Sequence, residues 1–207
     1  MFKRKRNDNE GNDNDNDNDN DNDNDSETDL VNVENNKIMF YSDVTSKSIV
    51  KLIKAIDQAK KYVNNNNISD IPIENKIYLH ICSDGGELYT ALAAIDIILD
   101  SKIKIVTICE GCVASAGVLI ALASDERYIR KHAYMLIHEI RSGCNGKYTE
   151  CKDDMINNDI LMKDMKKYMN DRCNNKQLKR EMNKILEHDI IWDAEKCLKY
   201  GLVNNIL

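Results

Sequence analysis

The chain has 207 residues, 42% of them hydrophobic, and a formal net charge of −6 at pH 7. This length and apolar content suffice for one domain with its own core, and no apolar run reaches the roughly 18 residues of a membrane-spanning helix. The opening MFKRKRNDNE has no apolar stretch after its charges, so we expect no secretory signal, a cytoplasmic location and reduced cysteines.

The acidic charge is concentrated at the N-terminus. Residues 1–29 contain four Lys/Arg and eleven Asp/Glu, and subtracting these from the totals of 29 and 35 leaves 25 and 24 for the rest. A nearly neutral body without a basic stripe predicts no nucleic-acid partner. Residues 7–29 are mostly repeated Asn-Asp with no apolar side chain to bury, so we expect a disordered tail over 1–36 and a folded domain over 37–207.

Strands and helices alternate along the folded part. Apolar patterns predict strands at 36–44, 76–83, 102–109 and 133–140. Helices are predicted between and after them, at 45–63, 87–100, 116–123, 150–171 and 176–187, followed by a last helix and strand within 193–207. This order predicts an α/β fold with a mostly parallel sheet, in which sites collect where strands end and helices begin.

Three strand ends carry residues suited to chemistry. Gly85 and Gly86 allow either a tight turn or a close approach of backbone N–H groups to another molecule. Ser115, among small residues, is suited either to capping a helix or to acting as a nucleophile, in which case the N–H of Ala116 would face the oxyanion that forms on the attacked carbonyl. His138 is the one of four histidines at a strand end, where it is either structural or a general base, whereas His80 lies inside a strand and reads as a core residue.

These stretches together resemble a known family. ICSDGGELYTALAAIDII, CEGCVASAGVLIALAS, AYMLIHE and DIIWDAEKCLKYGLVNNIL are similar, in order over residues 37–207, to the proteolytic subunit of the ATP-dependent Clp protease, ClpP. The resemblance implies a ClpP/crotonase-like fold with repeated strand–strand–helix units and a protruding handle at about 141–172. In that handle Ile160, Leu161, Met165 and Met169 would join two rings, the alternative being a helix packed on its own domain.

The family's functional positions carry over residue by residue. Ser115 matches the nucleophile, His138 the general base and Asp189 the orienting acid, with Asp193 as the less favoured acid. The two oxyanion-hole positions and the neighbouring substrate-backbone position match, in turn, Gly85, Ala116 and Gly86.

The implied activity is that of a Clp-type serine endopeptidase subunit, which hydrolyses unfolded proteins and peptides inside an oligomeric chamber. The implied partners are further copies of the chain, in heptameric rings stacked as a tetradecamer, and an AAA+ Clp ATPase, although the family's ATPase-facing N-terminal segment is not recognisable here. We expect no metal and no cofactor in this chain, because ATP would be used by the partner unfoldase.

Two departures from the family pattern leave alternatives open. Asp84 stands where the family has proline, and Glu139 stands where it has glutamine after the histidine. The alternatives are a catalytically impaired, structural ClpP-like subunit and, on the shared architecture, a crotonase-type acyl-CoA enzyme.

The cysteines do not predict a metal site. Cys109 and Cys112 form a C-x-x-C, but Cys144 and Cys151 are poorly spaced to supply a second zinc pair. Buried structural thiols are favoured over a redox pair.

Overall fold

The computed structural model describes residues 30–66 and 74–207. The disordered tail that we predict at 1–36 lies outside these residues as far as residue 29, but residues 30–34 form a strand, so that part of the prediction is wrong. No helix in the described part of the chain is long and apolar enough to cross a membrane.

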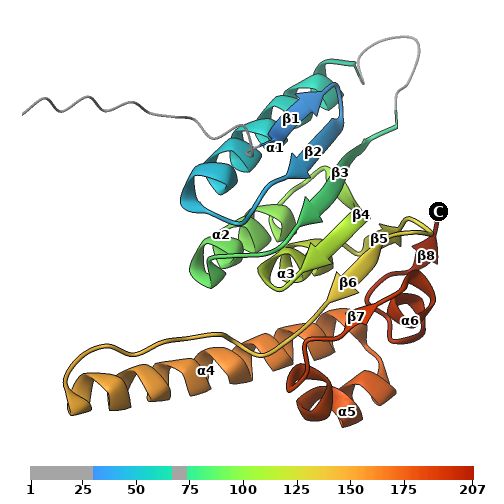
Figure 1. Ribbon diagram of the computed structural model, residues 1–207. Helices are drawn as coiled ribbons and strands as arrows, with labels where there is room; N and C mark the ends of the chain where they lie inside the picture. The colour runs from blue at the N-terminus through green and yellow to red at the C-terminus, as the bar shows by residue number, and fades with distance from the viewer. Residues whose placement is uncertain (1–29, 67–73) are drawn as a thin grey trace, which may run out of the picture.

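One mixed sheet organises the domain (Figure 1). Its strands are β1 (Leu30–Glu34), β2 (Lys37–Tyr41), β3 (Lys76–Ser83), β4 (Lys104–Ala114), β5 (Glu126–Ile129), β6 (Tyr134–Leu136), β7 (Ile191–Trp192) and β8 (Asn205–Ile206). The order β1-β2-β3-β4-β5-β8 is parallel except at the β1–β2 pair, while β6 runs parallel to β4 and antiparallel to β7. The predicted α/β architecture around a mostly parallel sheet is confirmed.

Six helices are found in the described residues: α1 (Ser46–Asn66), α2 (Leu88–Leu99), α3 (Ala116–Leu122), α4 (Tyr148–Cys173), α5 (Lys176–Leu186) and α6 (Ala194–Lys199). The first three lie side by side along the sheet (Figure 1). α1 buries Ile49, Leu52, Ile56 and Val63, which recur on one face of the helix as their spacing predicts. α3 is buried along its whole length, so the start of this helix sits at a fixed position at the end of β4.

α4 is the protruding handle, and the segment before it runs alongside (Figure 1). Its C-terminal end packs on the domain through Met169 and Cys173, which are buried. Its N-terminal half leaves large apolar side chains exposed, namely Tyr148, Met155, Ile156 and Ile160. The handle is therefore confirmed, but the expectation that Met169 joins two rings is wrong, because this side chain is 1% exposed and belongs to the core.

Several strands differ from the predicted ones, since β4 continues to Ala114, past the predicted end at residue 109, and β7 was not predicted. β1 begins at Leu30, ahead of residue 37, because Val31 and Val33 pack against the core in register with β2. β5 has no counterpart in the prediction. β6 ends at Leu136, so His138 lies beyond the strand and not within it.

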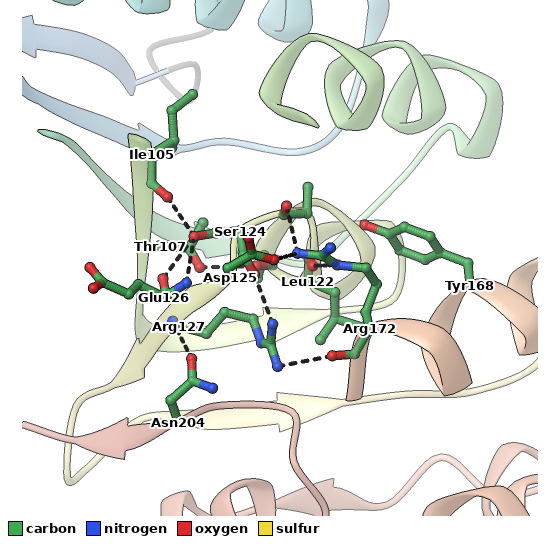
Figure 2. Close-up of polar contacts among 12 residues, drawn as sticks. Ile105, Thr107, Leu122, Ser124, Asp125, Glu126, Arg127, Tyr168, Arg172 and Asn204 are labelled. Carbon is green, nitrogen blue, oxygen red and sulfur yellow. Dashed lines mark hydrogen bonds and ion pairs between the residues drawn. The ribbon is translucent and has the colours of Figure 1, made fainter. Parts of the chain in front are cut away.

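Two arginines bind the handle to the sheet (Figure 2). Arg127 of β5 is 5% exposed, and its guanidinium donates to main-chain carbonyls of Ser124, Leu202, Gly201 and Arg172. Arg172 of α4 donates to the carbonyls of Leu122 and Ala123 at the end of α3 and pairs with Asp125. Burial lowers the pKa of Arg127, and its charge is balanced by carbonyl dipoles.

A second polar cluster joins β2, β3 and β4. Glu110 accepts hydrogen bonds from Tyr41 and Arg130 and lies 3.0 Å from His80 Nδ1. His80 is thus a satisfied structural histidine, as predicted. Although burial opposes it, hydrogen bonds from these neighbours lower the pKa of Glu110 to about 2, while burial and Glu110 raise the pKa of Tyr41 to about 12.

The expectation of reduced cysteines is wrong for one pair. Cys144 and Cys151 form a disulfide, because the chain before α4 folds back over the first turn of that helix. The five others are free: Cys109, Cys173 and Cys197 are buried, and Cys82 and Cys112 are half-buried. Among the described residues, no group of three or more Cys, His, Asp or Glu side chains is arranged to hold a metal ion.

Candidate active site

Ser115 occupies a sharp turn between β4 and α3. Its backbone has φ 52° and ψ −122°, a conformation that residues with a side chain rarely adopt. Its N–H donates to the carbonyl of Leu136 at 2.8 Å, so the end of β6 holds the turn in place. Its side chain makes no capping hydrogen bond to α3, so the helix-cap interpretation does not explain this serine.

The two glycines lie against this turn. An ideal Cβ on Gly85 would stand 2.7 Å from Ser115 Cβ and 3.1 Å from the Ala116 nitrogen, and φ is +95° at Gly85 and +144° at Gly86. Val44 fixes the turn from the other side, because its N–H donates to the Gly85 carbonyl and its carbonyl accepts from the Glu87 N–H. Glycine is therefore needed here because two chain segments approach each other closely, and not only because the chain turns.

The two glycine N–H groups differ in availability. The Gly85 N–H donates to Ser83 Oγ at 3.2 Å inside the fold. Gly86, in contrast, lines a cavity of about 410 Å3 together with Ser115 and Ala116. Gly86 is thus the glycine that faces this space with the serine, whereas the family correspondence favours Gly85 for the oxyanion hole.

Three acidic residues contribute to the lining of that cavity. Asp84, Glu87 and Glu139 line it, together with Leu88, Ile140, Met165, His138 and Arg141. Hydrogen bonds from Thr90 and Ser46 lower the pKa of Glu87, which keeps it ionised. Both departures from the family pattern, at 84 and 139, therefore add negative charge beside Ser115.

His138 reaches the cavity from the loop after β6. Its side chain is 10% exposed. Its Nδ1 lies 2.5 Å from the Glu139 carbonyl, and because a carbonyl can only accept, Nδ1 carries the proton. The opposite nitrogen, Nε2, is then the acceptor in the neutral ring, which is the tautomer that a base acting on a serine hydroxyl requires.

Asp189 lies on the far side of His138. Its Oδ1 is 4.0 Å from His138 Nδ1, and its other oxygen is bound by Arg141. A second cavity, of about 440 Å3, is lined by His138, Arg141 and Asp189. The segment 138–141 therefore forms the wall between a cavity with Ser115 and a cavity with Asp189, and His138 lines both.

The choice between the two candidate acids rests on these positions. Asp193 caps α6, because its side chain accepts a hydrogen bond from the Lys196 N–H at 2.8 Å. This structural role explains why an aspartate stands at that position. Asp189, in contrast, lies with its Oδ1 4.0 Å from His138 Nδ1. Two site residues were not foreseen: Ser83, which holds the Gly85 N–H, and Arg141, whose only sequence signal is its place three residues after His138.

Comparisons with known proteins identify the family and the fold of the chain. A model of the family described as Clp protease matches residues 31–207. The ATP-dependent Clp protease proteolytic subunit of Streptococcus mutans serotype c is 34% identical over 134 residues, covering 63% of this chain and 68% of that protein. A ClpP1 mutant from Listeria monocytogenes has the same fold, with a TM-score of 0.70 at 18% identity over 84% of this chain and 91% of that one.

Proposed function

Because the chain belongs to the Clp protease family, we propose that it is a serine endopeptidase subunit that cleaves unfolded proteins and peptides with Ser115, His138 and Asp189. The observation that carries the proposal is the placement of Ser115 in a strained strand-to-helix turn, with a free hydroxyl, in one cavity with His138. Backbone strain of this kind is characteristic of nucleophile positions and is not needed by a helix cap.

In the proposed reaction, Ser115 Oγ attacks the scissile carbonyl while His138 Nε2 takes the hydroxyl proton. The same nitrogen then returns the proton to the leaving amine, which leaves an acyl group on Ser115. A water molecule, activated by His138, hydrolyses this ester and regenerates the serine. Asp189 would orient the imidazole and stabilise its cation.

The oxyanion formed in each step needs two donors. The Ala116 N–H is one, since it follows Ser115 directly and lines the same cavity. For the second we propose the Gly86 N–H in place of that of Gly85, because the Gly85 N–H is bonded to Ser83. Losing one such donor typically lowers the rate by about 100-fold or more.

The proposal includes assembly. The apolar side chains exposed on α4, Met155, Ile156 and Ile160, form a surface suited to contact with a second copy of the handle. We propose heptameric rings that stack through it into a tetradecamer, with unfolded substrates delivered by an AAA+ Clp ATPase that hydrolyses the ATP. Light scattering tests the assembly, and a stable monomer at micromolar concentration would contradict it.

A fluorophosphonate probe tests the chemistry. We expect a single adduct on the wild-type chain, located at Ser115 by mass spectrometry and absent from Ser115→Ala and His138→Ala. Matched controls are Ser142→Ala and His132→Ala, which change exposed residues of the same types and should label normally. An assembled wild-type chain that never labels would support the alternative of a structural ClpP-like subunit.

A further inference from the structure

The carboxylate of Asp189 has two competing neighbours. Arg141 holds one oxygen in an ion pair, while the other oxygen stands 4.0 Å from His138 Nδ1. A hydrogen bond between nitrogen and oxygen needs about 3.2 Å or less, so the acid and the base are close but not bonded. The Nδ1 proton is donated instead to the Glu139 carbonyl.

We propose that Arg141 is a positioning residue that withholds Asp189 from His138 and thereby keeps the peptidase below its full rate. This inference rests on the proposed function, since it concerns the acid and base assigned there. In this view the chain exchanges between a state with Asp189 on Arg141, as in this structure, and a state with Asp189 on the imidazole, which is the faster catalyst.

The surroundings of Arg141 suit such an exchange. Its side chain is 73% exposed and that of Asp189 is 49% exposed, so both can move without disturbing the core. Arg141 lies in the irregular segment before α4, next to the wall formed by 138–141, and not in a helix or strand. A displacement of about 1 Å would bring Asp189 to bonding distance of His138.

The strength of the ion pair between Arg141 and Asp189 determines how much kcat should change when the pair is removed. An exposed ion pair shifts an equilibrium by about 1.5- to 5-fold and is weakened by salt. Removing the Arg141 charge should therefore raise kcat by about 2- to 5-fold. High ionic strength should also raise the wild-type kcat, because salt weakens the ion pair between Arg141 and Asp189.

The test compares kcat and KM of wild type, Arg141→Gln and Arg141→Lys on a fluorogenic peptide, at about 0.05 M and 0.5 M salt. Arg141→Gln should have the higher kcat with little change in KM and little response to salt. Arg141→Lys, which keeps the charge, should resemble wild type. Arg180→Gln removes an arginine of similar exposure (76%) from a surface pair and should change nothing.

A second comparison, made in the Asp189→Asn variant, separates the proposed effect of Arg141 on Asp189 from general effects on the structure. With Asp189→Asn in place, Arg141→Gln should give no gain, because the carboxylate that it releases is absent. A wild-type kcat equal to or above that of Arg141→Gln, or a gain that persists without Asp189, would overturn this inference alone. Failure of the fluorophosphonate probe to label Ser115 in both wild type and Arg141→Gln would overturn the proposed function itself.

Discussion

Replacing Gly85 with alanine should disable the site through the backbone and not through any catalytic group. Gly85 has φ +95°, where a residue with a side chain is strained by about 1 to 3 kcal/mol. The added Cβ would also stand 2.7 Å from Ser115 Cβ and 2.8 Å from the Ala114 carbonyl oxygen, closer than such atoms come. Since one of these is a backbone atom, the turn that carries Ser115 must move.

The expected loss follows from that movement. A shift on the order of 1 Å at a reacting group lowers the rate by about 100-fold. We therefore expect Gly85→Ala to slow peptide cleavage and fluorophosphonate labelling of Ser115 by at least that factor, with a loss of about 1 to 3 kcal/mol in the free energy of unfolding. Labelling rates measure the first quantity, and urea denaturation followed by circular dichroism measures the second.

Gly143→Ala is the matched control, because no heavy atom lies within 4 Å of an added Cβ and its φ is ordinary. This variant should keep the wild-type labelling rate and stability to within about 0.5 kcal/mol. Wild-type labelling by Gly85→Ala would refute the reasoning, since it would mean that Ser115 does not depend on this contact for its position.

Two further predictions concern stability. The lowered pKa of Glu110, about 2, means that its carboxylate stabilises the fold above pH 4.5 and that this contribution is lost as the pH falls toward 2. The difference in free energy of unfolding between wild type and Glu110→Gln should thus shrink by about 2 kcal/mol between pH 7 and pH 3 in urea titrations, and a constant difference would contradict the low pKa. Arg127→Met leaves buried carbonyls without a donor and should lose about 3 kcal/mol or more, whereas Arg180→Met, at an exposed pair, should lose less than about 1 kcal/mol; equal losses would show that the Arg127 network contributes little.

The cavity that contains Ser115 carries more acidic residues than the family pattern would give it. Asp84 and Glu139 replace neutral residues of the family pattern, and both line the cavity that contains Ser115. They leave the serine, the histidine and the acid in place. The departures therefore alter what surrounds the proposed catalytic residues more than those residues themselves.

Local patterns were sufficient for much of the fold. Apolar periodicity identified α1 and β3 because each element buries one continuous face or run of its own residues. Small residues around Ser115, and glycines at 85 and 86, marked the turns where chemistry is possible. β5 was not predicted because its four residues, ERYI, include a buried arginine, and three of the four carbonyls that this arginine binds are distant in the sequence.

The sequence by itself thus determined the order of elements, the α/β class and the candidate catalytic residues, since each depends on patterns within short stretches. Only the tertiary structure decided that Gly85 touches Ser115, that Cys144 pairs with Cys151 and that Arg141 holds Asp189, 48 residues away. The physical reason is that these contacts join groups whose own segments give no sign of a partner. The Gly85–Ser115 and Arg141–Asp189 contacts depend on how distant segments pack, and the disulfide depends on how the chain folds back over the first turn of α4.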